Sequence, residues 1–107
     1  MAQFLIAYFG GDHPSSPEEG KQHFVKYQQW LASLGEAAVS PMNPLKETAT
    51  IAPSGSTSNG SAAAMSGFTI VEAGTLQDAV GMAKACPFLD IGGTLEVSEM
   101  VKMPGST

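Results

Sequence analysis

The chain begins with an apolar segment, Gln3–Phe9, in which hydrophobic residues are not confined to one face. The segment is too short for a typical helix, is rich in aromatic and branched residues, and stops at a pair of glycines, so it predicts a strand. Alternate side chains would then point to opposite faces: Phe4, Ile6 and Tyr8 to one, and Leu5, Ala7 and Phe9 to the other. Such a pattern is typical of a central strand that is covered on both sides.

A helix is predicted over residues 17–34. Ser16 is a suitable cap, Pro17 suits the first helical position, and Glu19 at the third position can complete a capping box. Apolar residues then recur at helical spacing: Phe24, Tyr27, Leu31 and Leu34. Gly35 marks the end of the helix, because glycine adopts a positive φ at low cost.

Short runs of branched or apolar residues predict further strands at 36–40, 47–51, 68–73 and 94–101. Pro41 and Pro44 are expected to end the first of these, because proline cannot donate a hydrogen bond to a sheet. The second leads into a polar stretch, 52–62, which predicts a flexible hairpin loop with Asn59-Gly60 at its turn.

A second helix follows the strand at 68–73. Thr75 opens it with Asp78 three residues later, and Pro87 prevents it from continuing. Its apolar residues predict one buried stripe: Leu76, Ala79, Val80, Ala83 and Cys86. Residues 103–107 are expected to form a fraying tail.

This order predicts a single α+β domain over residues 1–107. Two strand–helix–strand units joined by a hairpin insertion are the split βαβ pattern of a ferredoxin-like sheet, with both helices on one face. The other face, including half of the first strand, would then be an exposed apolar patch of a size that monomers rarely tolerate. We therefore expect a homodimer in which two sheets face one another as a dimeric α+β barrel.

Composition excludes some classes of partner. Ten acidic and five basic residues give a net charge of -5, and the five lysines are dispersed along the chain, so nucleic acid is not expected as a partner. No stretch is long enough to span a bilayer, and the first residues lack the basic region of a signal peptide, so no membrane association is expected. Cys86 is the only cysteine, which excludes an internal disulfide and favours a reducing cytoplasm.

Several pieces of the chain, in this order, resemble the YCII-related family and its DGPF-type branch. They are the opening strand, Leu31-Ala32-Ser33-Leu34-Gly35, Ser40-Pro41-Met42, Gly67–Ala73, Cys86-Pro87 and Gly92–Val97. The Asp-Gly-Pro-Phe signature itself is absent, and Asn59-Gly60-Ser61-Ala62 stands in the region after the hairpin. The resemblance implies a dimeric α+β barrel, and for the broader family a small enzyme in which a His on the first helix, paired with an Asp, acts as an acid–base dyad.

His23 is the residue that the resemblance indicates for that role. Two features depart from the family pattern: the helix 17–34 contains no Asp, and alignment from Gly35 places Phe24 at the expected position. His23 shares a helix flank with Tyr27 and Trp30, at i+4 and i+7, which would suit a pocket wall. The alternative interpretation is a boundary histidine that packs beside aromatic rings without a catalytic role.

Asp12-His13 offers a second acid–base pair, in the loop that follows the first strand. Adjacent side chains seldom point to one place, so this pair also suits simple turn chemistry. His13, His23 and Asp12 together would be a minimal metal site, but two histidines in a sequence predict little without geometry, and we expect neither a metal nor a cofactor. Tyr8 and Ser40 are further candidates to line the cleft, whereas Cys86, on a buried stripe, suits a structural role.

Two kinds of function remain open. One is an enzyme that carries out proton transfer, in an elimination, hydrolysis or isomerisation of a small organic molecule, with His23 or the Asp12-His13 pair as acid and base. The other is a non-catalytic dimer that binds a small ligand or another protein. The positions of the two histidines relative to a cleft distinguish them.

Overall fold

The computed structural model describes residues 1–11, 15–60 and 64–101. Its centre is a four-stranded antiparallel sheet in the order β2-β5-β1-β6, and a separate two-stranded sheet pairs β3 with β4. Each helix joins two strands that flank a third: α1 joins β1 to β2 around β5, and α2 joins β5 to β6 around β1. The α+β class is therefore confirmed, with the strand order of a split βαβ sheet.

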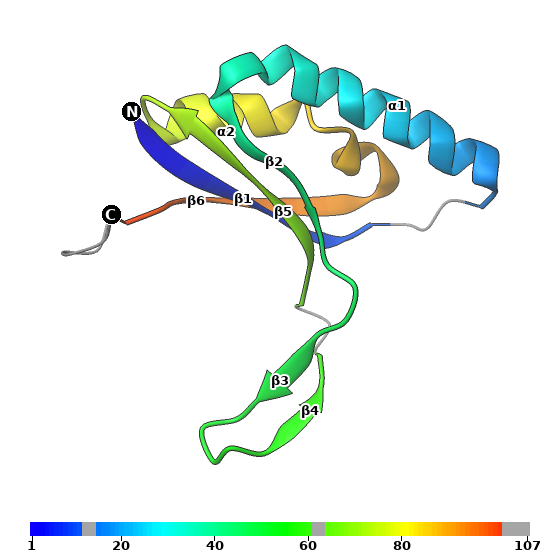
Figure 1. The fold of residues 1–107 in the computed structure, drawn as a ribbon, viewed down its shortest axis with the longest axis vertical. Helices are drawn as coiled ribbons and strands as arrows, with labels where there is room; N and C mark the ends of the chain where they lie inside the picture. The colour runs from blue at the N-terminus through cyan, green and yellow to red at the C-terminus, as the bar shows by residue number, and fades with distance from the viewer. Residues whose placement is uncertain (12–14, 61–63, 102–107) are drawn as a thin grey trace.

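The elements are β1 (Ala2–Gly10), α1 (Pro17–Leu34), a 3₁₀ turn η1 (Gly35–Ala37), β2 (Ala38–Pro44), β3 (Ala49–Ile51), β4 (Thr57–Asn59), β5 (Met65–Ala73), α2 (Leu76–Lys84), a second 3₁₀ turn η2 (Pro87–Ile91) and β6 (Gly93–Glu99). Both helices cover one face of the four-stranded sheet, and the β3–β4 hairpin extends from the other side (Figure 1). In the parts of the chain that the structure describes, no helix is long and apolar enough to cross a membrane.

Helix α1 has the predicted bounds because its ends are determined locally. The Glu19 N–H donates to the Ser16 hydroxyl at 3.1 Å, and Gly35 ends the helix with a φ of 57°. The predicted capping box is not formed, because the Glu19 carboxylate accepts hydrogen bonds from the hydroxyl and N–H of Ser15 instead. These bonds, first of all that from the hydroxyl, lower the pKa of Glu19.

Strand β2 continues through the proline that was expected to end it. It pairs with β5 from Ala38 to Pro44, with irregularities in register between Ala38 and Ser40 and between Ser40 and Asn43. Because β2 is an edge strand, proline is tolerated where its missing N–H faces away from β5 or falls in an irregularity. The prediction of a strand limited to 36–40 was therefore too short.

The hairpin also differs from the prediction. Its loop is only Pro53-Ser54-Gly55, held by bonds from the Ala52 N–H to the Ser56 carbonyl and from the Gly55 N–H to the Ala52 carbonyl, both 2.8 Å. Gly55 has a φ of 91°, as a three-residue hairpin loop with a bulge requires, whereas Asn59 and Gly60 do not adopt a positive φ. Residues 57–59, predicted as loop, are the return strand β4.

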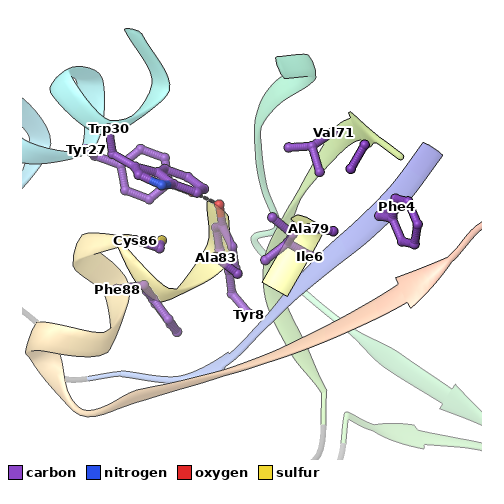
Figure 2. Packing of buried hydrophobic residues seen from close by; sticks show 11 residues of the cluster. Phe4, Ile6, Tyr8, Tyr27, Trp30, Val71, Ala79, Ala83, Cys86 and Phe88 are labelled. Carbon is purple, nitrogen blue, oxygen red and sulfur yellow. Dashed lines mark hydrogen bonds between the residues drawn. The ribbon is translucent and has the colours of Figure 1, made fainter. Parts of the chain in front are cut away.

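The core lies between the sheet and the helices (Figure 2). It consists of Phe4, Ile6, Tyr8, Tyr27, Trp30, Val71, Ala73, Ala79, Ala83, Cys86 and Phe88. Phe4 and Ile6 of β1 are completely buried, and each such side chain contributes about 1.5–3 kcal/mol by leaving water.

The buried stripe of α1 is rotated from the predicted one. Tyr27 and Trp30 are buried, whereas Phe24 is 46% exposed and Leu31 and Leu34 are partly buried at the margin. The Trp30 indole N–H donates to the main-chain carbonyl of Met82 at 2.9 Å, which ties α1 to the end of α2. The predicted stripe is therefore right for Tyr27, Leu31 and Leu34, which lie in the core or pack against it, and wrong for Phe24, and it did not include Trp30.

The opposite face of the sheet carries the second half of the β1 pattern. Leu5 lies opposite Ile70, and Ala7 lies opposite Phe68. Leu5, Ile70 and Phe68 keep part of their surface exposed, because neither helix covers this face. The two-sided apolar character of the first strand thus corresponds to one face packed in the core and one face on which Ala7 is buried and Leu5 and Phe9 are partly exposed.

Candidate functional site

A cavity of about 260 Å³ lies at the end of the sheet where β1 finishes and β5 begins, beneath the first half of α1. Its lining comes from α1, the end of β2, the sheet and η2: Tyr8, Gly20, His23, Phe24, Tyr27, Met42, Asn43, Pro44, Ser66, Gly67 and Phe88. The lining is mainly apolar, with three chemically active side chains, Tyr8, His23 and Tyr27. This composition is that of a small-molecule pocket.

Two tyrosines and a threonine form a chain of hydrogen bonds at this cavity. The Tyr27 hydroxyl bonds to the Tyr8 hydroxyl, which bonds to the Thr69 hydroxyl. Thr69 donates in turn to the main-chain carbonyl of Pro41 at 2.7 Å. Tyr8 and Tyr27 approach one another from the sheet and from α1 (Figure 2), with ring planes at 78° and centroids 6.0 Å apart.

Burial keeps both phenols neutral. Removal from water raises the pKa of Tyr8 far above its ordinary value, and raises the pKa of Tyr27 as well. The hydrogen bond with Thr69 lowers the pKa of each tyrosine, but by less than burial raises it. At neutral pH these hydroxyls therefore act as hydrogen-bonding groups and not as phenolate bases.

His23 lies on α1 one turn before Tyr27. Its ring centroid is 6.2 Å from that of Tyr27 with the planes tilted by 58°, and its side chain is partly exposed. Because His23 and Tyr27 are four residues apart on a helix, they share the flank that faces the cavity. The structure thus brings together three of the residues that the sequence indicated, Tyr8, His23 and Tyr27.

Trp30 and Ser40 are placed elsewhere. Trp30 follows Tyr27 around the helix into the core, where its indole N–H is bonded to Met82 and its ring packs edge-on against Tyr27. Trp30 follows His23 by seven residues, or about two turns, and so lies on nearly the same flank of the helix. It is one turn too far along the helix to reach the cavity. The Ser40 hydroxyl accepts a hydrogen bond from the Asn43 amide at 3.0 Å, and Asn43 lines the cavity whereas Ser40 does not.

Asp12 and His13 lie outside the described residues. Among residues 1–11, 15–60 and 64–101, no group of three His, Cys, Asp or Glu side chains is arranged to hold a metal ion. The described residues that line the cavity include no Asp, Glu, Lys or Arg, so His23 is the titratable group there besides the two tyrosines.

Cys86 lies behind the cavity, next to Tyr8. It is 2% exposed, and its burial raises the pKa of the thiol to about 11. A thiol that stays protonated at neutral pH is a poor nucleophile. Cys86 therefore packs as a small apolar group at the level of the tyrosine hydroxyls.

The sequence reasoning missed Thr69, which is completely buried and links Tyr8 to Pro41. A signal was present, because alternation along β5 places Thr69 with Val71 and Ala73 on the core face. A hydroxyl on a core face needs a partner there, and Tyr8 on the neighbouring strand is such a partner. Phe88 was also missed, although its ring stacks on that of Tyr8 at 5.1 Å.

A larger hollow, of about 600 Å³, lies at the opposite end of the sheet. It includes the carboxylates of Glu36, Glu72 and Asp78, and no histidine is among the described residues that line it. Acidic side chains around an open hollow are typical of a solvated surface. The smaller cavity is the candidate site because polar groups converge there on apolar walls.

Comparison with known proteins finds similarity to solved structures but not to a described family. No protein-family model matches the sequence, and no curated protein is significantly similar to it. Among solved structures, the chain is similar to 5-chloro-2-hydroxyhydroquinone dehydrochlorinase (TftG) from Burkholderia phenoliruptrix AC1100, in a complex with 2,5-dihydroxybenzoquinone. The TM-score is 0.52 with 19% identity, over 92% of this chain and 93% of that chain. A likeness at this level of identity shows a common fold.

Proposed function

We propose that the chain is a YCII-related protein whose cavity binds a small organic molecule, and that His23 transfers a proton to or from it. The observation that carries this proposal is the convergence of His23, Tyr8 and Tyr27 on one apolar cavity. A histidine is the side chain best suited to act as both acid and base near neutral pH. The apolar walls would exclude water from the proton transfer.

The volume of the cavity limits the ligand to a small ring. An apolar cavity of about 150 Å³ is enough to bind benzene, and the cavity here is about 260 Å³. One six-membered ring with a few substituents therefore fits inside it. Phe88 and Phe24 supply flat apolar surface for such a ring.

A solved structure of similar fold supports the same class of ligand. It is a dehydrochlorinase, and the molecule bound to it is a hydroxylated single ring, 2,5-dihydroxybenzoquinone. For this chain we infer an elimination, hydrolysis or isomerisation of a small ring compound. In an elimination, His23 would accept a proton from the substrate, the electron pair of that broken bond would form a double bond, and the leaving group would depart with the electron pair of its own bond.

A panel of hydroxylated and halogenated single-ring compounds tests this function, followed by optical absorbance and by halide release. For a compound that is turned over, His23→Ala should lower kcat by about 10²- to 10⁴-fold, the usual contribution of a general acid or base. Gln22→Ala, on the exposed surface of the same turn of α1, is the matched control and should keep the rate. Full activity in His23→Ala would exclude His23 as the acid–base group.

The second candidate is a non-catalytic module that binds a small ligand or another protein. The hydroxyl chain favours the ligand-binding form of this alternative, because buried hydroxyls at a pocket orient a ligand without turnover. The same panel separates the two functions. Binding of a compound without any conversion, with binding unaffected by His23→Ala, would favour the module.

We also propose that the protein is a homodimer in which two open sheet faces pack together as an α+β barrel. Leu5, Phe68 and Ile70 give this face an apolar centre, and the β3–β4 hairpin extends on the same side, where it would lie against a second copy (Figure 1). Two aligned sheets can bury such faces against each other. A reducing cytoplasm is the expected setting, because the only cysteine is buried and unpaired.

A further inference from the structure

The hydrogen bonds of the hydroxyl chain all run in one direction. That direction is determined by the last acceptor, the main-chain carbonyl of Pro41. A main-chain carbonyl can only accept, so the bond of 2.7 Å between Thr69 and Pro41 uses the single proton of the Thr69 hydroxyl. Thr69 then has only lone pairs left for Tyr8. In the bond between Tyr8 and Thr69, the Tyr8 hydroxyl must therefore be the donor.

The same reasoning passes along the chain to Tyr27. Because Tyr8 gives its proton to Thr69, it accepts the proton of Tyr27 in the next bond. All three hydroxyl protons are thus consumed inside the protein. Tyr8 and Tyr27 line the cavity, and their hydroxyl oxygens keep lone pairs but have no proton to offer.

We propose that the cavity selects ligands that bring a hydrogen-bond donor, specifically a neutral ring hydroxyl of the phenol class, over rings of similar shape that carry only acceptors. This inference rests on the proposed function, because it defines the ligand of the same cavity. A phenol hydroxyl would donate to the lone pairs of Tyr27 or Tyr8. An ether or carbonyl oxygen at that point would face other lone pairs, which is unfavourable between apolar walls.

The charge of the cavity agrees with a neutral ligand. The part of its lining that the structure describes contains no Lys or Arg to neutralise a phenolate. Removal of an unpaired anion from water is costly, so a simple phenol, with an ordinary pKa near 10, would bind in its protonated form. The proton that the ligand donates to the hydroxyl chain is then present at neutral pH.

A pair of probes tests the inference: phenol and anisole, in which a methyl group replaces the hydroxyl proton. Each is titrated into the full chain at neutral pH, and the dissociation constants are measured by calorimetry or by NMR. One neutral hydrogen bond, together with the repulsion avoided, predicts that phenol binds about tenfold more tightly than anisole. The ratio of the two dissociation constants in the wild-type protein tests the inference without any variant.

Substitution of Thr69 tests whether the preference for phenol over anisole comes from the hydroxyl chain. Thr69→Val keeps the shape but removes the acceptor for the Tyr8 proton, so Tyr8 can donate to Tyr27 and Tyr27 can donate into the cavity. Phenol and anisole, which both carry an acceptor oxygen, should then bind within about twofold of each other. Thr69→Ser keeps the hydroxyl and should keep the tenfold preference, with circular dichroism as the check on folding.

The outcomes distinguish this inference from the proposed function. Equal or tighter binding of anisole by the wild-type protein would overturn the donor selectivity while leaving the cavity as a ligand site. A tenfold preference that persists in Thr69→Val would also overturn it, because the preference would come from another group. If neither probe binds at millimolar concentration, both the inference and the proposed function fail.

Discussion

At the scale of single residues, the cavity depends on one tightly enclosed ring. The Phe88 side chain stacks on Tyr8 and lies against two glycines, Gly11 and Gly93. A Cβ atom at Gly93 would come within 2.2 Å of the Phe88 ring and within 2.7 Å of its carbonyl oxygen. Glycine at this position is thus required by close approach and not by backbone conformation.

Gly93→Ala should therefore destabilise the protein by about 1–3 kcal/mol, the usual cost of overpacking. Phe88 must move, and its stacking on Tyr8 is lost. Urea unfolding followed by the fluorescence of Trp30, the only tryptophan, measures the change. Gly81→Ala in α2 is the matched control, because a Cβ there meets nothing within 4 Å.

Gly81→Ala should instead stabilise the protein by up to about 1 kcal/mol, because alanine has the higher helix propensity. The two substitutions add the same methyl group and are predicted to have opposite signs. A stable Gly93→Ala variant would show that the Phe88 ring is not held as described.

The buried thiol and phenols predict a loss of stability in alkali. The pKa of Cys86 is about 11 in the folded protein against an ordinary 9.0, so between these values the unfolded chain gives up a proton that the folded chain keeps. The free energy of unfolding must then fall as pH rises from about 9 to about 11. Tyr8 and Tyr27, with raised pKa values, act in the same direction at higher pH.

Urea unfolding at about pH 8, 9 and 10 measures this effect. The Cys86→Ala variant should lose less stability than the wild type between about pH 9 and pH 10, because it lacks the thiol. Parallel curves for the two proteins would contradict the raised pKa of Cys86.

Residue spacing along α1 predicted part of the cavity. His23 and Tyr27 lie on one flank because they are four residues apart, and Tyr8 meets them because it ends the core face of β1. Trp30 does not line the cavity with them, and Thr69 bonds to the hydroxyl of Tyr8. Those two outcomes depend on contacts across the fold, with Met82 and Pro41, that no local pattern contains.

At the scale of elements, the best predictions concern ends that are determined by neighbouring residues. Ser16 and Thr75 cap their helices as expected, and Gly35 ends α1. The extents of β2 and β4 were not predicted, because a strand of Pro, Ser and Asn residues is defined by its partner. Hydrogen bonding of β2 to β5 and of β4 to β3 holds these residues in strands, although their β propensity is low.

The β3–β4 hairpin is predicted to open far more easily than the sheet. Its three residue pairs carry exposed side chains, and Ile51 is 71% exposed, so little burial supports its hydrogen bonds. Amide hydrogen exchange should show weak protection at Ile51 and strong protection at Ile6 in β1, measured below the concentration at which the protein self-associates. Equal protection would mean that the hairpin is held by contacts beyond those described.

At the scale of the whole molecule, the order of elements was enough to predict the split βαβ sheet and the placement of both helices on one face. The proposal of a dimer follows from the face left open. Sedimentation should find a dimer at micromolar concentration, and Ile70→Arg, at the centre of the open face, should give a folded monomer.

Val25→Arg is the control for this experiment. Val25 lies on the outer surface of α1 and is 50% exposed, so a charge there should leave the dimer intact. If the wild-type protein is a monomer, or if both variants behave alike, the open face is not the dimer interface.

The central claim is that the cavity between α1 and the end of the sheet is the ligand site. Two-dimensional NMR of the ¹⁵N-labelled protein, with and without excess phenol, tests it most directly. The account predicts that the largest shifts occur at amides around the cavity, such as those of Gly20, His23 and Gly67. Shifts concentrated instead around Glu72 and Gln77, in the hollow at the opposite end of the sheet, would contradict it.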